Sequence, residues 1–138
     1  MTLDLALLAE KVAAVERHLI RVAEKLPENP EDLRPSSDAS DAVILHLWQA
    51  IQIVIDLALS TCVHLRLGAP ATYADAFRAL AAQGHLDPVL ADRLVKAAGF
   101  RNFLAHAYEG LDMARVHDVA KQGPADLRAF LMTLRNLG

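Results

Sequence analysis

The sequence has little of what marks a secreted or membrane-spanning protein. Cys62 is the one cysteine among 138 residues, so no disulfide can form within the chain, and a reducing cytoplasm suits it. No apolar run approaches the roughly 18 residues of a membrane span, and the first helix lacks the basic start of a signal peptide. We therefore expect a cytoplasmic protein with no membrane partner, in which Cys62 is a small buried apolar residue.

The chain also has few aromatics, no excess of basic charge and no metal-binding pattern. Aromatic residues make up 5% and hydrophobic residues 54%, which predicts a core of Leu, Ala, Val and Ile. The net charge of −3 excludes general attraction to a polyanion, so any nucleic-acid contact must be local. The six histidines include no H-x3-H or E-x-x-H pair, and we therefore expect no metal and no other cofactor.

Helical periodicity and helix-capping residues fill the sequence, and alternation typical of strands is missing. Apolar residues recur every three or four positions from Leu5 to Leu26, as in a helix packed along other helices. Pro, Gly and capping residues divide the chain further. The expected helices span residues 5–26, 41–67, 72–84, 87–110, 112–122 and 124–137. In this scheme Gly123 and Pro124 break the last segment in two. The prediction is an all-α antiparallel bundle, one domain over residues 1–138.

Residues 100–112 concentrate polar side chains on an otherwise apolar helix. At about 100° per residue, Arg101 and Tyr108 return to nearly one face, and Asn102 and His106 form an adjacent stack. Arg101 and His106 are about 140° apart, so this pair flanks a groove rather than touching. These side chains are either ordinary interhelical hydrogen-bonding residues or a partly exposed face, or they form a reactive site.

The reactive interpretation follows from what each side chain does near neutral pH. Histidine takes up and releases a proton, and arginine is a permanent cation that binds phosphate. In RNA cleavage the 2′-OH is the nucleophile, so the enzyme needs only proton transfer and stabilisation of a negative phosphorane. One histidine fits two proton transfers poorly. A twofold homodimer that places two copies of His106 across one groove would complete the pair.

Asp56 is the charge most out of place in the second expected helix. It lies between Ile55 and Leu57, and a buried carboxylate needs a partner. We expect it to face Arg101 or Asn102 and to orient the groove; the alternative is a bond to another helix elsewhere.

The segment "RNFLAHAY" has the R-x4-H-x-Y pattern, with Asn after Arg, and resembles the HEPN superfamily, in particular the HepT-like toxins. The segment "QAIQIVIDLALS" resembles the Gln-rich, Asp-bearing central helix of that family. Residues 72–102 are similar to the short helix that leads into its signature helix. The resemblance covers most of the chain, from about Asp41 to Leu134.

The resemblance implies a four- to five-helix bundle, usually a homodimer with both signatures in one cleft. It also implies a metal-independent endoribonuclease toxin of a type VII-like toxin–antitoxin pair, with RNA as substrate. Its partner would be a minimal nucleotidyltransferase antitoxin that adenylylates Tyr108. Arg101 and His106 are then the catalytic pair and Asn102 a supporting residue. The alternative is a non-catalytic helical dimer that serves as a binding partner of a nucleotidyltransferase.

Overall fold

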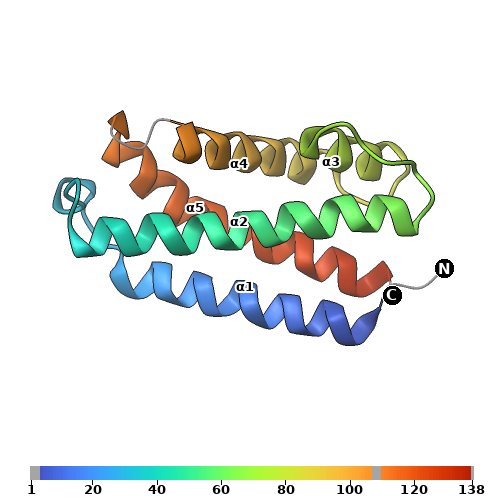
Figure 1. The fold of residues 1–138 in the computed structure, drawn as a ribbon, viewed down its shortest axis with the longest axis horizontal. Coiled ribbons are helices and arrows are strands. Elements are labelled where there is room, and N and C mark those ends of the chain that lie inside the picture. Colours follow the sequence, from blue (N-terminus) through green and yellow to red (C-terminus); the bar gives the residue numbers. More distant parts are fainter. Residues whose placement is uncertain (1–3, 107–109, 138) are drawn as a thin grey trace.

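The computed structural model describes residues 4–106 and 110–137 of the chain (Figure 1). Over these residues the chain forms five α-helices, one 3₁₀ turn and no strand, which confirms the all-α prediction. In chain order the elements are α1 (Leu5–Lys25), η1 (Pro30–Asp32), α2 (Asp38–His64), α3 (Tyr73–Ala82), α4 (Pro88–His106) and α5 (Met113–Leu137).

Helix α2 is the central element of the bundle. It contacts α1, α3, α4 and α5, and Figure 1 shows α1 along one side of it and α3 with α4 along the other. The chain direction alternates through α1, α2, α4 and α5, so the bundle is antiparallel as predicted. Among the described residues, α2 is also the one helix long and apolar enough to cross a membrane by length and hydropathy, a test that the core helix of a bundle passes as well.

The core is made of aliphatic side chains with a few phenylalanines. On α1 the buried residues are Leu8, Val15, Leu19 and Val22. Phe77 on α3 and Phe130 on α5 meet edge to face, with ring centroids 5.5 Å apart, and this joins two helices that are distant in sequence. Cys62 is fully buried, as predicted, and burial raises the pKa of its thiol.

Side-chain caps fix where the helices begin. Thr72 accepts a hydrogen bond from the Asp75 backbone N–H at 3.1 Å, which confirms the cap predicted for α3. Helix α2 begins at Asp38 and not at Asp41, because Ser37 and Ser40 form a reciprocal capping box. A serine at the third position replaces the usual Glu or Gln of that motif, so the pattern did not stand out in the sequence.

The predicted break at Gly123 and Pro124 is wrong. Helix α5 runs without interruption from Met113 to Leu137 and contains Pro124. Proline removes one backbone hydrogen bond, but the buried side chains on both sides of it form one continuous stripe against the core. Those side chains are Val116, Ala120, Leu127, Leu131 and Leu134. Their burial outweighs the lost bond.

Candidate active site

Helix α4 carries the polar signature at its C-terminal end. Asp87 caps the helix by accepting the Leu90 backbone N–H at 3.0 Å, and Pro88 is its first residue, both as predicted. Arg101 lies in the part of α4 that the structure describes in full. The described helix ends at His106, whose side chain lies outside the described residues, as does the whole of Tyr108.

Arg101 is held against a neighbouring helix by an aromatic ring. Its guanidinium carbon lies 5.6 Å from the centre of the Trp48 ring on α2, within the range of a cation–π contact. Its Nη1 donates to the Asn102 side-chain oxygen at 3.3 Å. Within residues 4–106 and 110–137 the buried Nε has no hydrogen-bond partner and no carboxylate pairs with the guanidinium. Within this part of the chain, Arg101 is thus a cation without a carboxylate partner at the α2–α4 seam.

Asn102 is exposed and accepts a hydrogen bond from its neighbour Arg101. A supporting role for Asn102 in the site is compatible with this contact and stays a prediction.

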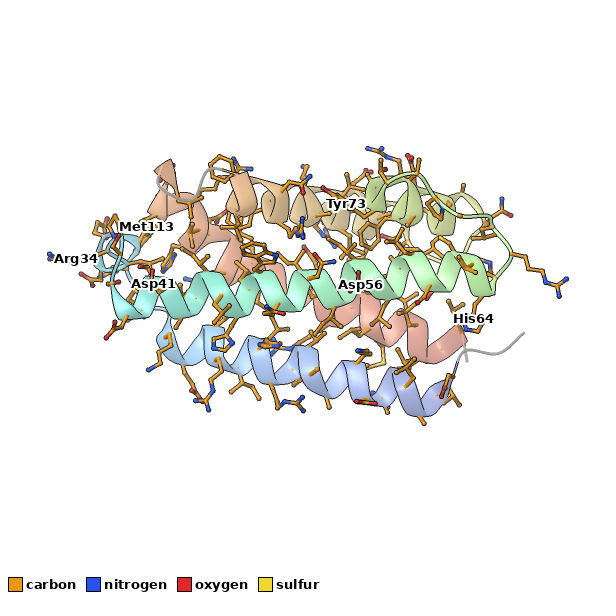
Figure 2. All side chains as sticks on the ribbon, viewed as in Figure 1. Arg34, Asp41, Asp56, His64, Tyr73 and Met113 are labelled. Carbon is orange, nitrogen blue, oxygen red and sulfur yellow. The ribbon has the colours of Figure 1, made fainter. Side chains whose placement is uncertain are left out.

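Asp56 is exposed, so the expectation of a buried carboxylate is wrong. It lies near the middle of α2 (Figure 2) and accepts a hydrogen bond from the Gln52 amide nitrogen at 3.0 Å. Among the described residues its partner is thus one turn away on its own helix, and neither Arg101 nor Asn102 bonds to it. Its apolar sequence neighbours face inward, and helical geometry turns Asp56 outward. A role for Asp56 in the site stays a prediction.

Trp48, which the sequence did not assign to the site, contacts it, and Gln52 follows one turn farther along α2. Trp48 supports Arg101, and Gln52 has a buried side-chain oxygen with no hydrogen-bond partner among the described residues. Trp48, Gln52 and Asp56 are spaced by four, so they share one face of α2. The sequence signal that could have found Trp48 is this spacing, which leads from Asp56 through Gln52 to Trp48.

Another side of α4 faces a groove shared with α5, with a volume of about 390 Å³. Lys96 lines it, as does Arg93, whose Nε lies 2.9 Å from an Asp126 carboxylate oxygen. Arg115 of α5 lies over the rings of Phe100 and Phe103, 5.6 Å and 5.0 Å from their centres. Cations thus flank α4 on two sides, and the one next to Trp48 lacks a carboxylate partner among the described residues.

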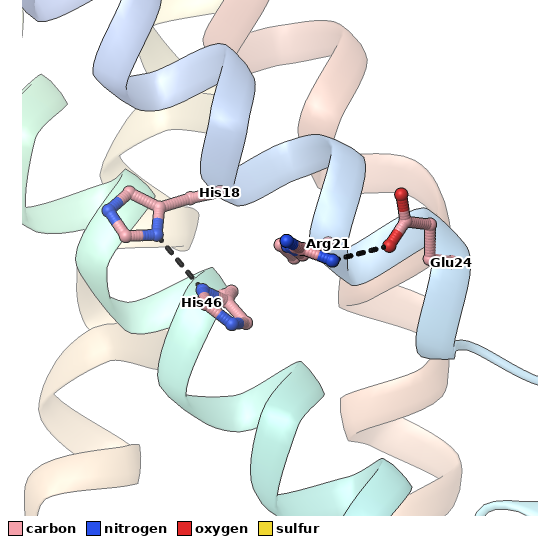
Figure 3. A network of polar contacts seen from close by, with 4 residues as sticks. All are labelled: His18, Arg21, Glu24 and His46. Atoms are coloured by element: carbon pink, nitrogen blue, oxygen red, sulfur yellow. Dashed lines mark hydrogen bonds and ion pairs between the residues drawn. The ribbon is translucent and has the colours of Figure 1, made fainter.

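No group of three or more His, Cys, Asp or Glu side chains in the described part of the chain is arranged to hold a metal ion. Two histidines do meet, His18 of α1 and His46 of α2, with their Nδ1 atoms 3.0 Å apart (Figure 3). Burial, followed by the nearby charges of His46 and Arg17, lowers the pKa of His18. Because α1 and α4 share no contact within the described residues, this pair is separate from the α4 site.

Comparison with known proteins connects this arrangement to a family. A curated relative, the mRNA nuclease HepT of Shewanella oneidensis strain MR-1, is 26% identical over 129 residues, covering 94% of this chain and 96% of the relative. A tri-AMPylated HEPN toxin of Shewanella oneidensis, solved in complex with MNT antitoxin, matches with a TM-score of 0.84 at 26% identity over 94% of this chain and 96% of the toxin.

A toxin–antitoxin structure with AMP-PNP matches at a TM-score of 0.85 and 25% identity, covering 94% of this chain and 97% of the other. The family model described as "Ribonuclease HepT-like" matches residues 15–134, a span that includes α2, α3, α4 and the motif. The chain belongs to the HepT-like ribonuclease family.

Proposed function

We propose that this chain is a metal-independent endoribonuclease, the toxin of a type VII-like toxin–antitoxin pair that acts in the cytoplasm. The observation that carries the proposal is the state of Arg101 at its position in the R-x4-H-x-Y motif. Its guanidinium is half-buried beside Trp48 and has no carboxylate partner among the described residues. A cation held in this way is available for a phosphate.

The chemistry needs no protein nucleophile. The 2′-oxygen attacks the adjacent phosphorus as His106 removes its proton, and the bond from phosphorus to the 5′-oxygen breaks. A second imidazole gives its proton to that leaving oxygen, so the products are a 2′,3′-cyclic phosphate and a 5′-hydroxyl. Arg101 stabilises the negative charge that develops on the phosphorane, which is often a large part of catalysis. Asn102 supports the guanidinium through its 3.3 Å contact.

We place the second imidazole on another copy of the chain. Each chain has one signature histidine, and a twofold homodimer brings His106 of the partner subunit across the same cleft. One histidine then accepts the proton while the other donates, and their roles are interchangeable by symmetry.

Neutralisation acts through Tyr108 in this proposal. The related toxin of Shewanella oneidensis was solved in a tri-AMPylated form with MNT antitoxin, and another relative pair was solved with AMP-PNP. A nucleotidyltransferase antitoxin would transfer AMP to the Tyr108 hydroxyl, two residues beyond His106, and release pyrophosphate from ATP. The added phosphate places negative charge where the RNA phosphate must bind, so it excludes substrate without unfolding the bundle.

The test is cleavage of RNA in the presence of a chelator by the purified chain and by its Arg101→Ala and His106→Ala variants. We expect the native chain to cut and both variants to lose at least about 100-fold in rate. Intact RNA with the native chain, or equal cutting by all three proteins, would leave the other function in place: a non-catalytic dimer that binds a nucleotidyltransferase. Mass spectrometry after incubation with the antitoxin and ATP should find AMP on Tyr108 and none on a Tyr108→Phe variant.

A further inference from the structure

Arg101 is supported by an aromatic side chain from the neighbouring helix. Its guanidinium carbon lies 5.6 Å from the centre of the Trp48 ring, and its buried Nε has no hydrogen-bond partner among the described residues. Three other arginines, Arg21, Arg93 and Arg128, form ion pairs with carboxylates. Arg115 lies over phenylalanine rings, but on the side of α4 that faces α5. At Arg101, the ring of Trp48 takes the place that a carboxylate has in those ion pairs.

We propose that Trp48 is a positioning residue of the active site, which holds the guanidinium of Arg101 in place for the phosphate without neutralising it. The proposal rests on the proposed ribonuclease function. A carboxylate would fix the side chain equally well, but it would occupy the N–H donors and cancel the charge that the phosphorane needs. The face of an indole attracts the cation without occupying its N–H donors, of which the structure uses one, on Nη1, for the contact with Asn102.

The ring itself is firmly anchored. Trp48 is half-buried on α2, and the core residues Leu47 and Ile51 beside it are 0% and 2% exposed. Helix α2 contacts every other α-helix, so it is the element of the bundle least free to shift. The contact with Trp48 therefore fixes the position of Arg101, on α4, relative to the central helix of the bundle.

The activity test compares Trp48→Phe and Trp48→Leu with the native protein. Loss of a cation–π contact of this kind corresponds to about 5- to 30-fold in rate, and we expect Trp48→Leu to lose this much in kcat. KM for RNA should change less than about twofold, because a positioned charge acts mainly in the transition state. Trp48→Phe keeps a weaker ring and should recover part of the rate.

A matched control separates positioning from packing. Leu57 is also half-buried on α2, and nine residues place it about 180° around the helix from Trp48. Leu57→Ala should lower the thermal midpoint and leave kcat unchanged. If Trp48→Leu lowers the midpoint similarly but cuts RNA at the native rate, Trp48 is only a packing residue and the proposal is overturned.

A spectroscopic test does not depend on cleavage, because Trp48 is the one tryptophan in the chain. Its emission should change in an Arg101→Leu variant, and a 2′-deoxy oligonucleotide that cannot be cleaved should change it in the native protein but not in that variant. If the native protein fails to cut RNA, the proposed ribonuclease function is wrong. The emission of Trp48 still tests whether Trp48 contacts Arg101. Emission unaffected by Arg101→Leu would overturn the proposed contact whatever the activity.

Discussion

Two arginines on neighbouring helices of this bundle are held in opposite ways. Arg128 of α5 donates two hydrogen bonds to the Glu16 carboxylate of α1, at 3.0 Å and 2.7 Å. The Arg128 bonds lower the pKa of Glu16, and Glu16 in turn raises the pKa of Arg128. Arg101 of α4 lies over the Trp48 ring, with a buried Nε that has no partner among the described residues.

The difference separates a cation that joins helices from one that is kept for a ligand. In the α1–α5 pair both charges are satisfied, and nothing remains to attract a phosphate. At the α2–α4 seam the guanidinium lies beside an aromatic ring and has no carboxylate partner within residues 4–106 and 110–137, which suits a site for an anion. The two arginines should therefore respond differently to substitution, Arg101 in activity and Arg128 in stability.

Replacing Arg101 by alanine should reduce RNA cleavage and leave stability nearly unchanged. Arg101→Ala should lower RNA cleavage by about 10²- to 10³-fold, because a donor that stabilises transition-state charge is lost. Its free energy of unfolding should change by less than about 1 kcal/mol, since Arg101 forms no ion pair within the described residues. Steady-state cleavage and urea unfolding measure the two effects. Cleavage by Arg101→Ala at the native rate would contradict a role of Arg101 in the reaction.

Replacing Trp48 by Glu should give Arg101 a carboxylate partner like the one that Arg128 has in Glu16. A carboxylate beside Arg101 would form a charge-assisted pair, worth about 1.5–3 kcal/mol in such contacts, and compete with the substrate phosphate. We expect cleavage to fall by about 100-fold. Trp48→Gln is the control, because it removes the ring and adds no charge. Equal rates for the Glu and Gln variants would mean that neutralising Arg101 has no effect on the reaction.

Arg128→Ala should act on stability alone. The pair is partly exposed, so its loss should lower the free energy of unfolding by about 0.5–1 kcal/mol and the thermal midpoint by about 2–4 °C. Because the folded-state pKa of Glu16 is below its ordinary value of 4.5, this contribution is present above that pH and is lost as the pH falls through the folded-state pKa. A deficit that stays constant on acidification would contradict this assignment.

The smallest effect is expected from His18. Burial, with the charges of His46 and Arg17, holds its pKa below the ordinary value of 6.5, so the folded protein binds fewer protons than the unfolded chain below that pH. Stability is therefore full above about pH 6.5 and declines as the pH falls through the folded-state pKa. Calorimetry of His18→Gln should show an acid-induced fall in thermal midpoint smaller by about 1–2 °C than in the native chain. RNA cleavage should be unchanged.

Helix identity and most helix starts could be predicted from the sequence because their causes are local. Asp87 with Pro88, and Thr72 ahead of α3, are caps that act within one turn. The motif on α4 could be found because its residues are also close in sequence. These signals located the signature helix and the candidate residues Arg101 and Asn102 before any packing was known.

The remaining features depend on packing between helices. Pro124 predicts a break on local grounds, and only the stripe of buried residues around it explains why α5 continues. Asp56 was expected to be buried from its apolar neighbours, but helical phase turned it to solvent. The contact of Trp48 with Arg101 joins residues 53 positions apart, and no pattern within either helix predicts that the two side chains meet.

The most direct test uses two RNA oligonucleotides that differ by one oxygen. The first is unmodified, and the second carries a single 2′-deoxy nucleotide at the site that the native chain cuts. In chelator, we expect the first to yield a 2′,3′-cyclic phosphate and a 5′-hydroxyl, and the second to stay intact at that position. Cleavage of the 2′-deoxy position, or cleavage that requires added metal, would contradict attack by the 2′-oxygen at the Arg101 site.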